Sequence, residues 1–182
     1  MENKADLHLF TDGKLEVTLL RLCHQLIENY PDFQDTVLLA IQPRGVYLGR
    51  RISALLAKLC PDISIPYGEI DVTFQRDDIG RHKGPLLPNQ TSIDFIVEGK
   101  RVILIDDVLY TGRTIRAALD AMLAFGRPDS VELLVLVDRQ RKRELPIEAV
   151  YYGVKVDTLD SEKVIVRLKE GGGEDSIRIE SR

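Results

Sequence analysis

The chain has few cysteines and no long hydrophobic segment, and both absences limit the class of protein it can be. Cys23 and Cys60 show neither the spacing of a zinc site nor a pattern of disulfide pairs. No apolar run approaches the roughly 20 residues that a membrane-spanning helix needs. Residues 1–6 also lack the basic and apolar regions of a secretory signal peptide. We therefore expect a cytoplasmic protein with no membrane contact, in which Cys23 is a small core residue.

An excess of positive charge is also missing. The 182 residues include 25 lysines and arginines against 29 aspartates and glutamates, which gives a formal net charge of −4. No overall field draws the protein to nucleic acid, so any RNA binding must come from a local basic patch. A hydrophobic content of 44% with 30% charged residues fits a globular protein, and we expect residues 1–182 to form a single domain.

Buried strands and amphipathic helices alternate along the chain. Apolar runs typical of parallel strands buried on both faces occupy 36–41, 102–105 and 131–137. Apolar residues recur with helical spacing in 14–30, 48–59 and 115–125. Further strands are predicted at 68–76, 149–156, 163–168 and 177–179. This alternation predicts an α/β fold, with a central, mostly parallel sheet flanked by helices.

The stretch 102–114 combines a buried strand, an acidic pair and a glycine-containing loop. Asp106 and Asp107 follow the apolar run, where ligands bind in open α/β sheets. The loop 110–114 then enters a helix, whose N-terminal N–H groups favour an anion, and Gly112 allows close approach or positive φ. A ligand with neighbouring hydroxyls and a phosphate, such as a ribose 5-phosphate, matches both halves. A polar turn without a ligand is the alternative, which the attached loop disfavours.

This stretch resembles the phosphoribosyl pyrophosphate (PRPP) motif of type I phosphoribosyltransferases. Its wording Asp-Asp-Val-Leu-Tyr-Thr-Gly-Arg-Thr most resembles the pyrimidine operon regulatory protein/uracil phosphoribosyltransferase family (PyrR). The resemblance implies that fold, with a core at about 14–137, a flexible β-loop and a small hood at about 138–170. It also implies that Asp106 and Asp107 bind the ribose hydroxyls and that 111–114 binds the 5-phosphate. The motif residues are Val102, Ile103, Leu104, Ile105, Asp106, Asp107, Val108, Leu109, Tyr110, Thr111, Gly112, Arg113 and Thr114.

A second loop of the same kind follows the strand expected at 36–41. It contains Pro43, Arg44 and Gly45, and by itself it is more often an ordinary turn than an anion site. The family resemblance implies that Arg44 and Gly45 receive pyrophosphate. It further implies a non-proline cis peptide bond in this neighbourhood, which is rare elsewhere.

A long polar segment, 75–92, follows the strand expected at 68–76, in which Ile70, Val72 and Phe74 share one buried side. A loop of this length in a compact domain is usually functional or disordered. The resemblance implies a flexible loop that closes over the reactants and expels water. A solvated charged hairpin is the alternative. The catalytic residues implied are Asp106, Asp107, Arg44 and Arg76, with Arg81 and Lys83 as further candidates.

The strand expected at 131–137 is followed by Asp138, Arg139 and a basic cluster. Together with 143–147, this region resembles the family's hood, which covers the base. The resemblance implies base contacts at Asp138 and Arg139, and a further one near Val156, in the stretch Lys155-Val156-Asp157.

The family resemblance implies a reaction and a second role. The reaction is uracil + PRPP → UMP + pyrophosphate, with Mg²⁺ bound through the substrate's phosphates and not by a protein cage. The second role is a regulator that senses UMP or UTP and binds pyrimidine-operon messenger RNA. A homodimer or larger homo-oligomer is also implied. The candidate RNA contacts are Arg21, His24, Arg139, Arg141, Lys142 and Arg143.

Three alternatives stay open. The first is an RNA-binding attenuation regulator with little catalysis. The second is a phosphoribosyltransferase for a purine base, which the 102–114 motif does not exclude but the hood match disfavours. The third is a phospho-acceptor receiver domain, in which the acidic pair binds Mg²⁺ but the loop 110–114 has no function.

Overall fold

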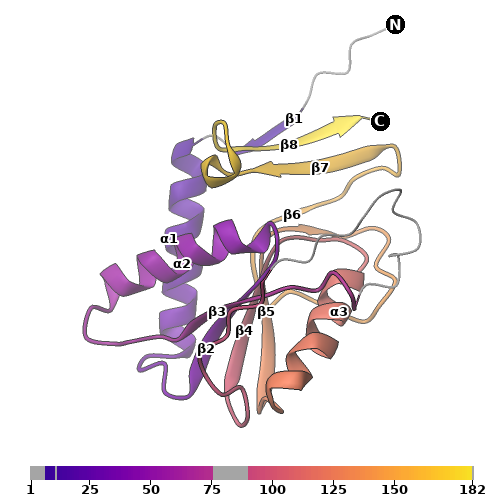
Figure 1. Cartoon of the computed structure of the whole chain (residues 1–182). Coiled ribbons are helices and arrows are strands. Elements are labelled where there is room, and N and C mark those ends of the chain that lie inside the picture. The colour runs from indigo at the N-terminus through magenta and orange to yellow at the C-terminus, as the bar shows by residue number, and fades with distance from the viewer. Residues whose placement is uncertain (1–6, 11, 76–89, 182) are drawn as a thin grey trace, which may run out of the picture.

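The computed structural model describes residues 7–10, 12–75 and 90–181. Its centre is a five-stranded sheet with the strand order β3-β2-β4-β5-β6 (Figure 1). All four neighbouring pairs are parallel, which confirms the predicted α/β sheet. The strands are β2 (Thr36–Ile41), β3 (Tyr67–Ile70), β4 (Arg101–Leu109), β5 (Ser130–Arg139) and β6 (Tyr151–Val156).

Helices cover both faces of this sheet (Figure 1). Side chains of β4 alternate between the two faces. Ile103 and Ile105 pack with the helices at 12–29 and 45–59, while Val102 and Leu104 pack with the helix at 113–122. No helix in the described parts of the chain is long and apolar enough to cross a membrane. The helices are α1 (Asp12–Asn29) and α2 (Gly45–Leu59) on one face, and α3 (Arg113–Met122) with the short η2 (Leu123–Phe125) on the other.

Cys23 is a core residue, as predicted. It lies on α1 with no exposed surface, and burial raises the pKa of its thiol to about 12. A thiol with so high a pKa is a poor nucleophile at neutral pH, since the thiolate is the reactive form.

A second, three-stranded antiparallel sheet brings the two ends of the described chain together (Figure 1). It has the order β1-β8-β7 and packs Val164, Val166 and Ile177 into the same core as α1 and α2. The hood expected at about 138–170 overlaps this sheet only in part, because the sheet also takes in the first strand and extends to Ser181. Its elements are β1 (Leu7–Phe10), β7 (Glu162–Arg167), η3 (Lys169–Gly171) and β8 (Ser176–Ser181).

The strand predicted at 68–76 is wrong in its end point. β3 ends at Ile70, because its parallel partner β2 ends at Ile41 in the same register. The chain then turns at Asp71, whose Oδ1 accepts hydrogen bonds from the backbone N and the hydroxyl of Thr73. Phe74, which we expected to be buried, is 64% exposed.

The acidic pair lies within a strand and not beyond its end. β4 continues past the predicted end at 105 to Leu109, because β5 pairs alongside it as far as Asp138. The prediction of a non-proline cis peptide near Arg44 and Gly45 is also wrong. The cis bond in the described residues joins Gln42 to Pro43, where the tertiary amide lowers the cost of the cis form.

Candidate active site

The site lies where neighbouring strands send their helices to opposite sides of the sheet. β2 leads into α2, which returns the chain to β3 at the edge, whereas β4 leads into α3 and then β5. β2 and β4 are adjacent, so their carboxyl ends form the switch point at which open α/β sheets bind ligands. The two loops at this point are named the Pro43 loop (42–45) and the Gly112 loop (110–113).

The acidic pair is buried beside these loops. Asp106 is 6% exposed and Asp107 is 8% exposed, and the backbone N of Asp107 donates to Asp106 Oδ1 at 2.9 Å. Burial raises the pKa of the Asp107 carboxyl above its usual range, and the positive charge of Arg44 opposes this rise only in part. Buried carboxylates of this kind favour a ligand that supplies hydrogen-bond donors, such as sugar hydroxyls.

The Pro43 loop approaches the acidic pair as closely as a backbone can. Gly45 begins α2, and a Cβ on it would lie 2.6 Å from Ile105 O and 3.2 Å from Asp106 Oδ1. Arg44 is the exposed N-cap residue, and no side chain caps this helix. The first N–H groups of α2 therefore face the site beside a cation, which favours an anion.

The Gly112 loop has the same relation to α3. Gly112 is the N-cap residue with φ of 94° and has no side chain to cap the helix, while Arg113 N donates to Thr111 Oγ1 at 3.3 Å. A Cβ at this position would be strained and would approach Leu145 Cβ to 3.3 Å. Thr111 O accepts hydrogen bonds from Glu144 N at 3.0 Å and from Leu145 N at 3.3 Å. A second anion site is thus held in place by the segment that follows β5.

Two arginines bind Tyr110 of the Gly112 loop. Arg143 donates to Tyr110 O and lies 2.5 Å from Asp138 Oδ1. Arg139 lies over the Tyr110 ring, 3.8 Å from its centroid, and its Nη2 donates to Thr158 Oγ1 at 2.7 Å. The end of β5 and the loop that follows it therefore hold the loop at the end of β4.

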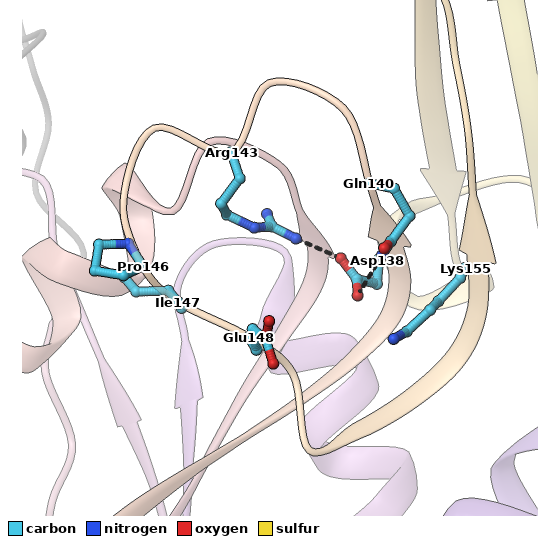
Figure 2. Close-up of a pocket in the computed structure, with 7 residues that line it drawn as sticks. All are labelled: Asp138, Gln140, Arg143, Pro146, Ile147, Glu148 and Lys155. Atoms are coloured by element: carbon cyan, nitrogen blue, oxygen red, sulfur yellow. Dashed lines mark hydrogen bonds and ion pairs between the residues drawn. The ribbon is translucent and has the colours of Figure 1, made fainter.

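A pocket of about 270 Å³ opens next to Asp138 (Figure 2). Asp138 is almost fully buried, and its two carboxylate oxygens bind Arg143 and the side-chain amide of Gln140. In Figure 2, Lys155 extends from the neighbouring strand beside Asp138, and Glu148 lies on the loop that closes the pocket. The pocket therefore offers hydrogen-bond donors and acceptors to a small polar ring.

Residues 11–170 match the model of the phosphoribosyl transferase domain family. The chain belongs to this family. Bifunctional protein PyrR of Clostridium novyi is 44% identical over 171 residues, which cover 94% of this chain and 95% of that protein. The PyrR protein of Enterococcus faecalis is 46% identical over 161 residues, which cover 88% of this chain and 89% of that protein. The predicted PyrR family and phosphoribosyltransferase class are confirmed, and the receiver-domain alternative is excluded.

Solved phosphoribosyltransferases have the same fold. A hypoxanthine phosphoribosyltransferase of Trypanosoma cruzi superposes with a TM-score of 0.72 over 97% of each chain, at 16% identity. A hypoxanthine-guanine phosphoribosyltransferase of Bacillus anthracis gives a TM-score of 0.69 over 96% of each chain, at 17% identity. At such identities these neighbours confirm the type I fold alone, and they carry no information on the base.

This phosphoribosyltransferase places the predicted base contacts in two environments. Asp138 lines the 270 Å³ pocket, whereas Arg139 and Val156 are buried away from its lining. The assignment of Asp138, Arg139 and Val156 to the base stays a prediction. Lys155 and Glu148 also line the pocket. Lys155 lies in the stretch 155–157 where the base contact was expected. Glu148 was not singled out, because it precedes β6 on a loop that only the fold brings to the pocket.

Arg139, one of the predicted RNA contacts, is buried at 6% exposure, and the others lie on two parts of the structure. Arg21 and His24 are exposed on α1, where Arg21 donates to the backbone O of Tyr152 and of Gly153. Arg141 and Lys142 lie on the loop after β5, whereas Arg143 turns inward to Asp138. These assignments stay predictions. The loop residues expected to act in catalysis, Arg76, Arg81 and Lys83, lie outside the described residues.

A cleft of about 540 Å³ separates the Pro43 loop from the small sheet. It is lined by Arg44 and Asp107, two of the predicted site residues, together with Tyr47 of α2. Two further cations, Lys163 and Arg167 of β7, line the same cleft and were missed by the sequence analysis. A signal was present, because the buried valines of β7 alternate with these exposed basic residues, but only the fold shows what the basic side faces.

Proposed function

We propose that this chain is a cytoplasmic uracil phosphoribosyltransferase, which converts uracil and PRPP into UMP and pyrophosphate. The observation that carries the proposal is the buried acidic pair between the N-termini of α2 and α3, whose N-cap residues, Arg44 and Gly112, make no side-chain cap hydrogen bond. PRPP has a matching shape, with ribose hydroxyls between a 5-phosphate and a diphosphate. The relatives named bifunctional protein PyrR, at 44% and 46% identity, support it.

Each part of the site then has one task. Asp106 and Asp107 accept hydrogen bonds from the ribose hydroxyls, the Gly112 loop binds the 5-phosphate, and the Pro43 loop binds the diphosphate. The bond between ribose C1 and the diphosphate oxygen breaks as uracil N1 bonds to C1 and loses its proton. Positive charge that builds on the ribose is stabilised by the carboxylates, and negative charge on the leaving group by Arg44 and, in our proposal, Arg76.

Magnesium fits this site as a substrate-bound ion. Within residues 7–10, 12–75 and 90–181, no group of three or more histidine, cysteine or acidic side chains is placed to hold a metal. Mg²⁺ keeps several waters and binds through one or two carboxylates together with substrate phosphates, so Asp106 and Asp107 are sufficient on the protein side. When bound, it neutralises the charge of the departing pyrophosphate.

The base is assigned to the region of Asp138, Arg139 and Val156. Uracil presents a ring N–H between two carbonyl groups. A carboxylate held by Arg143 and Gln140 can accept from that N–H, and Lys155 can donate to a carbonyl. Cytosine has an acceptor in place of the ring N–H, so an unpaired acceptor would face Asp138 and disfavour it.

The test is pyrophosphate release from PRPP and Mg²⁺ with each nucleobase in turn. Turnover with uracil alone, lost in an Asp106→Asn/Asp107→Asn double variant, supports the proposal. The matched control is Asp62→Asn/Asp129→Asn, which removes the same charge from two exposed positions and keeps wild-type turnover. Turnover with a purine base instead of uracil would replace the substrate, and no turnover with any base despite UMP binding would favour a regulator with little catalysis.

We also propose that the chain regulates pyrimidine-operon messenger RNA in response to UMP or UTP, as a homodimer or larger assembly. The word bifunctional in the names of its relatives supports this second role. The contacts proposed are Arg21, His24, Arg141, Lys142 and Arg143, and not Arg139, whose side chain is buried against Tyr110 and Thr158. Arg141 and Lys142 already pair with Asp157 and Asp160 at 2.5 and 2.9 Å, so RNA phosphates must compete with these acids.

Binding of a pyrimidine-operon leader RNA, measured with and without UMP at several salt concentrations, tests this role. A specific complex that UMP strengthens and that weakens steeply with salt is expected. An Arg141→Gln/Lys142→Gln variant should bind less tightly and keep full transferase activity. Equal binding of the leader RNA and an unrelated RNA would contradict the proposal.

A further inference from the structure

We infer that Lys163 and Arg167 of β7 bind the diphosphate of PRPP from the side opposite the Pro43 loop. The inference rests on the proposed function and adds two residues to it. It begins from the 540 Å³ cleft, which is lined by the Pro43 loop on one side and by β7 on the other. The remaining lining comes from Tyr47 of α2, Asp107 of β4 and the segment 168–172 after β7.

The fold fixes these two side chains at the cleft. Val164 and Val166 are 6% and 8% exposed and pack in the core with α1 and α2. Lys163 and Arg167 alternate with them and are exposed along the cleft. The two residues are four positions apart in the strand, so their Cα atoms are about 13 Å apart. Long side chains at that spacing can reach a diphosphate from both ends.

Neither side chain has a partner of opposite charge within the described residues. Lys163 lies opposite Glu180 in the register of β7 and β8, but Glu180 Oε1 is 2.7 Å from Arg178 Nε. Arg167 lies opposite Ser176, which is neutral. The cleft therefore gathers Arg44, Lys163 and Arg167 around one carboxylate, Asp107, in a chain with a net charge of −4. Such a local excess of positive charge attracts anions.

Ion pairs join the segment after β7, on one side of the cleft, to α2 on the other side. Arg51 of α2 binds Glu170 at 2.6 Å and Asp175 at 2.7 Å, on either side of the glycines that follow η3. Hydrogen bonds from the Arg51 guanidinium hold the pKa of Glu170 and of Asp175 below the usual range. Gly171 in turn lies against Tyr47, where a Cβ would be 3.1 Å from the ring. These contacts keep β7 next to the Pro43 loop. Lys163 and Arg167 therefore stay on the same cleft as Arg44.

The position of the cleft selects the diphosphate over the 5-phosphate. Its lining includes Pro43, Arg44 and Asp107 but no residue of the Gly112 loop. A ribose on the acidic pair with its 5-phosphate at that loop directs C1 and the leaving group toward the Pro43 loop. Lys163 and Arg167 then meet the charge that develops as the bond to C1 breaks, so they should affect kcat as well as KM.

The experiment uses a Lys163→Gln/Arg167→Gln double variant and measures calorimetric binding of pyrophosphate and of PRPP, each with Mg²⁺. We expect a Kd for pyrophosphate raised about tenfold or more, because two charge-assisted hydrogen bonds are lost. UMP affinity and the KM for uracil stay at wild-type values. The charge-preserving Lys163→Arg/Arg167→Lys variant keeps most of the affinity. The matched control is Lys58→Gln/Arg127→Gln, which removes two exposed charges elsewhere and leaves both ligands unaffected.

The outcomes separate this inference from the proposed function. If the wild type turns over uracil and the double variant binds pyrophosphate as the wild type does, the inference is wrong and the function stands. If the wild type binds pyrophosphate, the variant does not, and no base is turned over, the inference stands and the function is wrong. Loss of RNA binding with unchanged pyrophosphate binding would also overturn the inference, and would assign the two cations to RNA.

Discussion

The Pro43 loop and the Gly112 loop begin helices at the same edge of the sheet, but different parts of the chain hold them. Gly45 packs on the backbone of β4, where a Cβ would lie 2.6 Å from Ile105 O. The Gly112 loop is held from outside the sheet, since Thr111 O accepts two hydrogen bonds from the segment 143–147. One of the two proposed anion sites is therefore fixed to the acidic pair, and the other to the residues that close the pocket beside Asp138.

Because of this difference, the two loops should respond differently to changes elsewhere in the site. The end proposed to bind the diphosphate depends on contacts within the sheet, which are close-packed and leave little room for adjustment. The end proposed to bind the 5-phosphate depends on backbone hydrogen bonds to a loop that also contains Arg143, the partner of Asp138. Changes in the base pocket can thus shift the Gly112 loop without moving the Pro43 loop.

The largest expected effect is that of Gly45→Ala. The new methyl group must displace the backbone of β4 or of α2, which lowers the free energy of unfolding by about 3 kcal/mol. Activity should fall about 100-fold, because Arg44 and Asp107, which line the same cleft, no longer keep their relative positions. Chemical denaturation and pyrophosphate release measure the two effects. Gly13→Ala is the control, since Gly13 lies in α1 with nothing within 4 Å of the added atom. Wild-type stability in Gly45→Ala would show that the close approach is not required.

Asp107→Asn should reduce activity about 10- to 100-fold and yet stabilise the ligand-free protein. The folded-state pKa of Asp107 is raised above its unfolded value, so the ionised carboxyl lowers stability at neutral pH. This loss is absent below the unfolded pKa and appears as the pH rises through the folded pKa. Unfolding free energies of wild type and variant, measured from pH 4 upward, should therefore diverge as the pH rises. The stability of Asp62→Asn, at an exposed position, should follow the wild type. A destabilised Asp107→Asn variant would contradict this prediction, because the attraction between Arg44 and the Asp107 carboxylate would then exceed the cost of burying that carboxylate.

Gly112→Ala should destabilise the protein by about 1–2 kcal/mol, because φ is 94° and an added Cβ meets Leu145. The KM for PRPP should rise, since the strain falls on the 5-phosphate loop. Gly99→Ala is the matched control. Gly99 also has positive φ, at 70°, but nothing lies within 4 Å of its Cβ position and it is remote from the site in the register of the sheet. An equal rise in KM for Gly99→Ala would show that the effect is not local.

The parts of the site that are local in sequence could be predicted from it. The apolar run, the acidic pair and the glycine loop of 102–114 are contiguous, so their order alone places them at the end of one strand. The end of β4 could not be predicted, because the length of β5 decides it. Lys163 and Arg167 were missed for a related reason. Pairing of β7 with β8 aims them at the cleft, and β1 completes that sheet from the other end of the chain.

The basic cluster at 141–143 is split by the backbone conformation of Lys142, which the sequence pattern does not predict. The three consecutive cations suggest one solvated surface. Lys142, however, has φ of 64°, and the chain reverses direction there. Arg143 consequently points to Asp138 and Tyr110 O, while Arg141 stays exposed beside Asp157. A positive φ at a lysine is set by the packing around it and has no signature in the sequence.

The smallest expected effect, that of Glu144→Gln, tests how the Gly112 loop is held. Arg113 Nε lies 2.6 Å from Glu144 Oε2, but both side chains are nearly half exposed, and such surface pairs contribute about 0–1 kcal/mol. The substitution keeps Glu144 N and its hydrogen bond to Thr111 O, because that donor belongs to the backbone. We therefore expect stability and the KM for PRPP to stay close to wild type, with any small difference lost at about 1 M salt, where charges are screened over a few ångströms. A KM raised as far as in Gly112→Ala would contradict this view, since the ion pair and not the backbone would then hold the 5-phosphate loop.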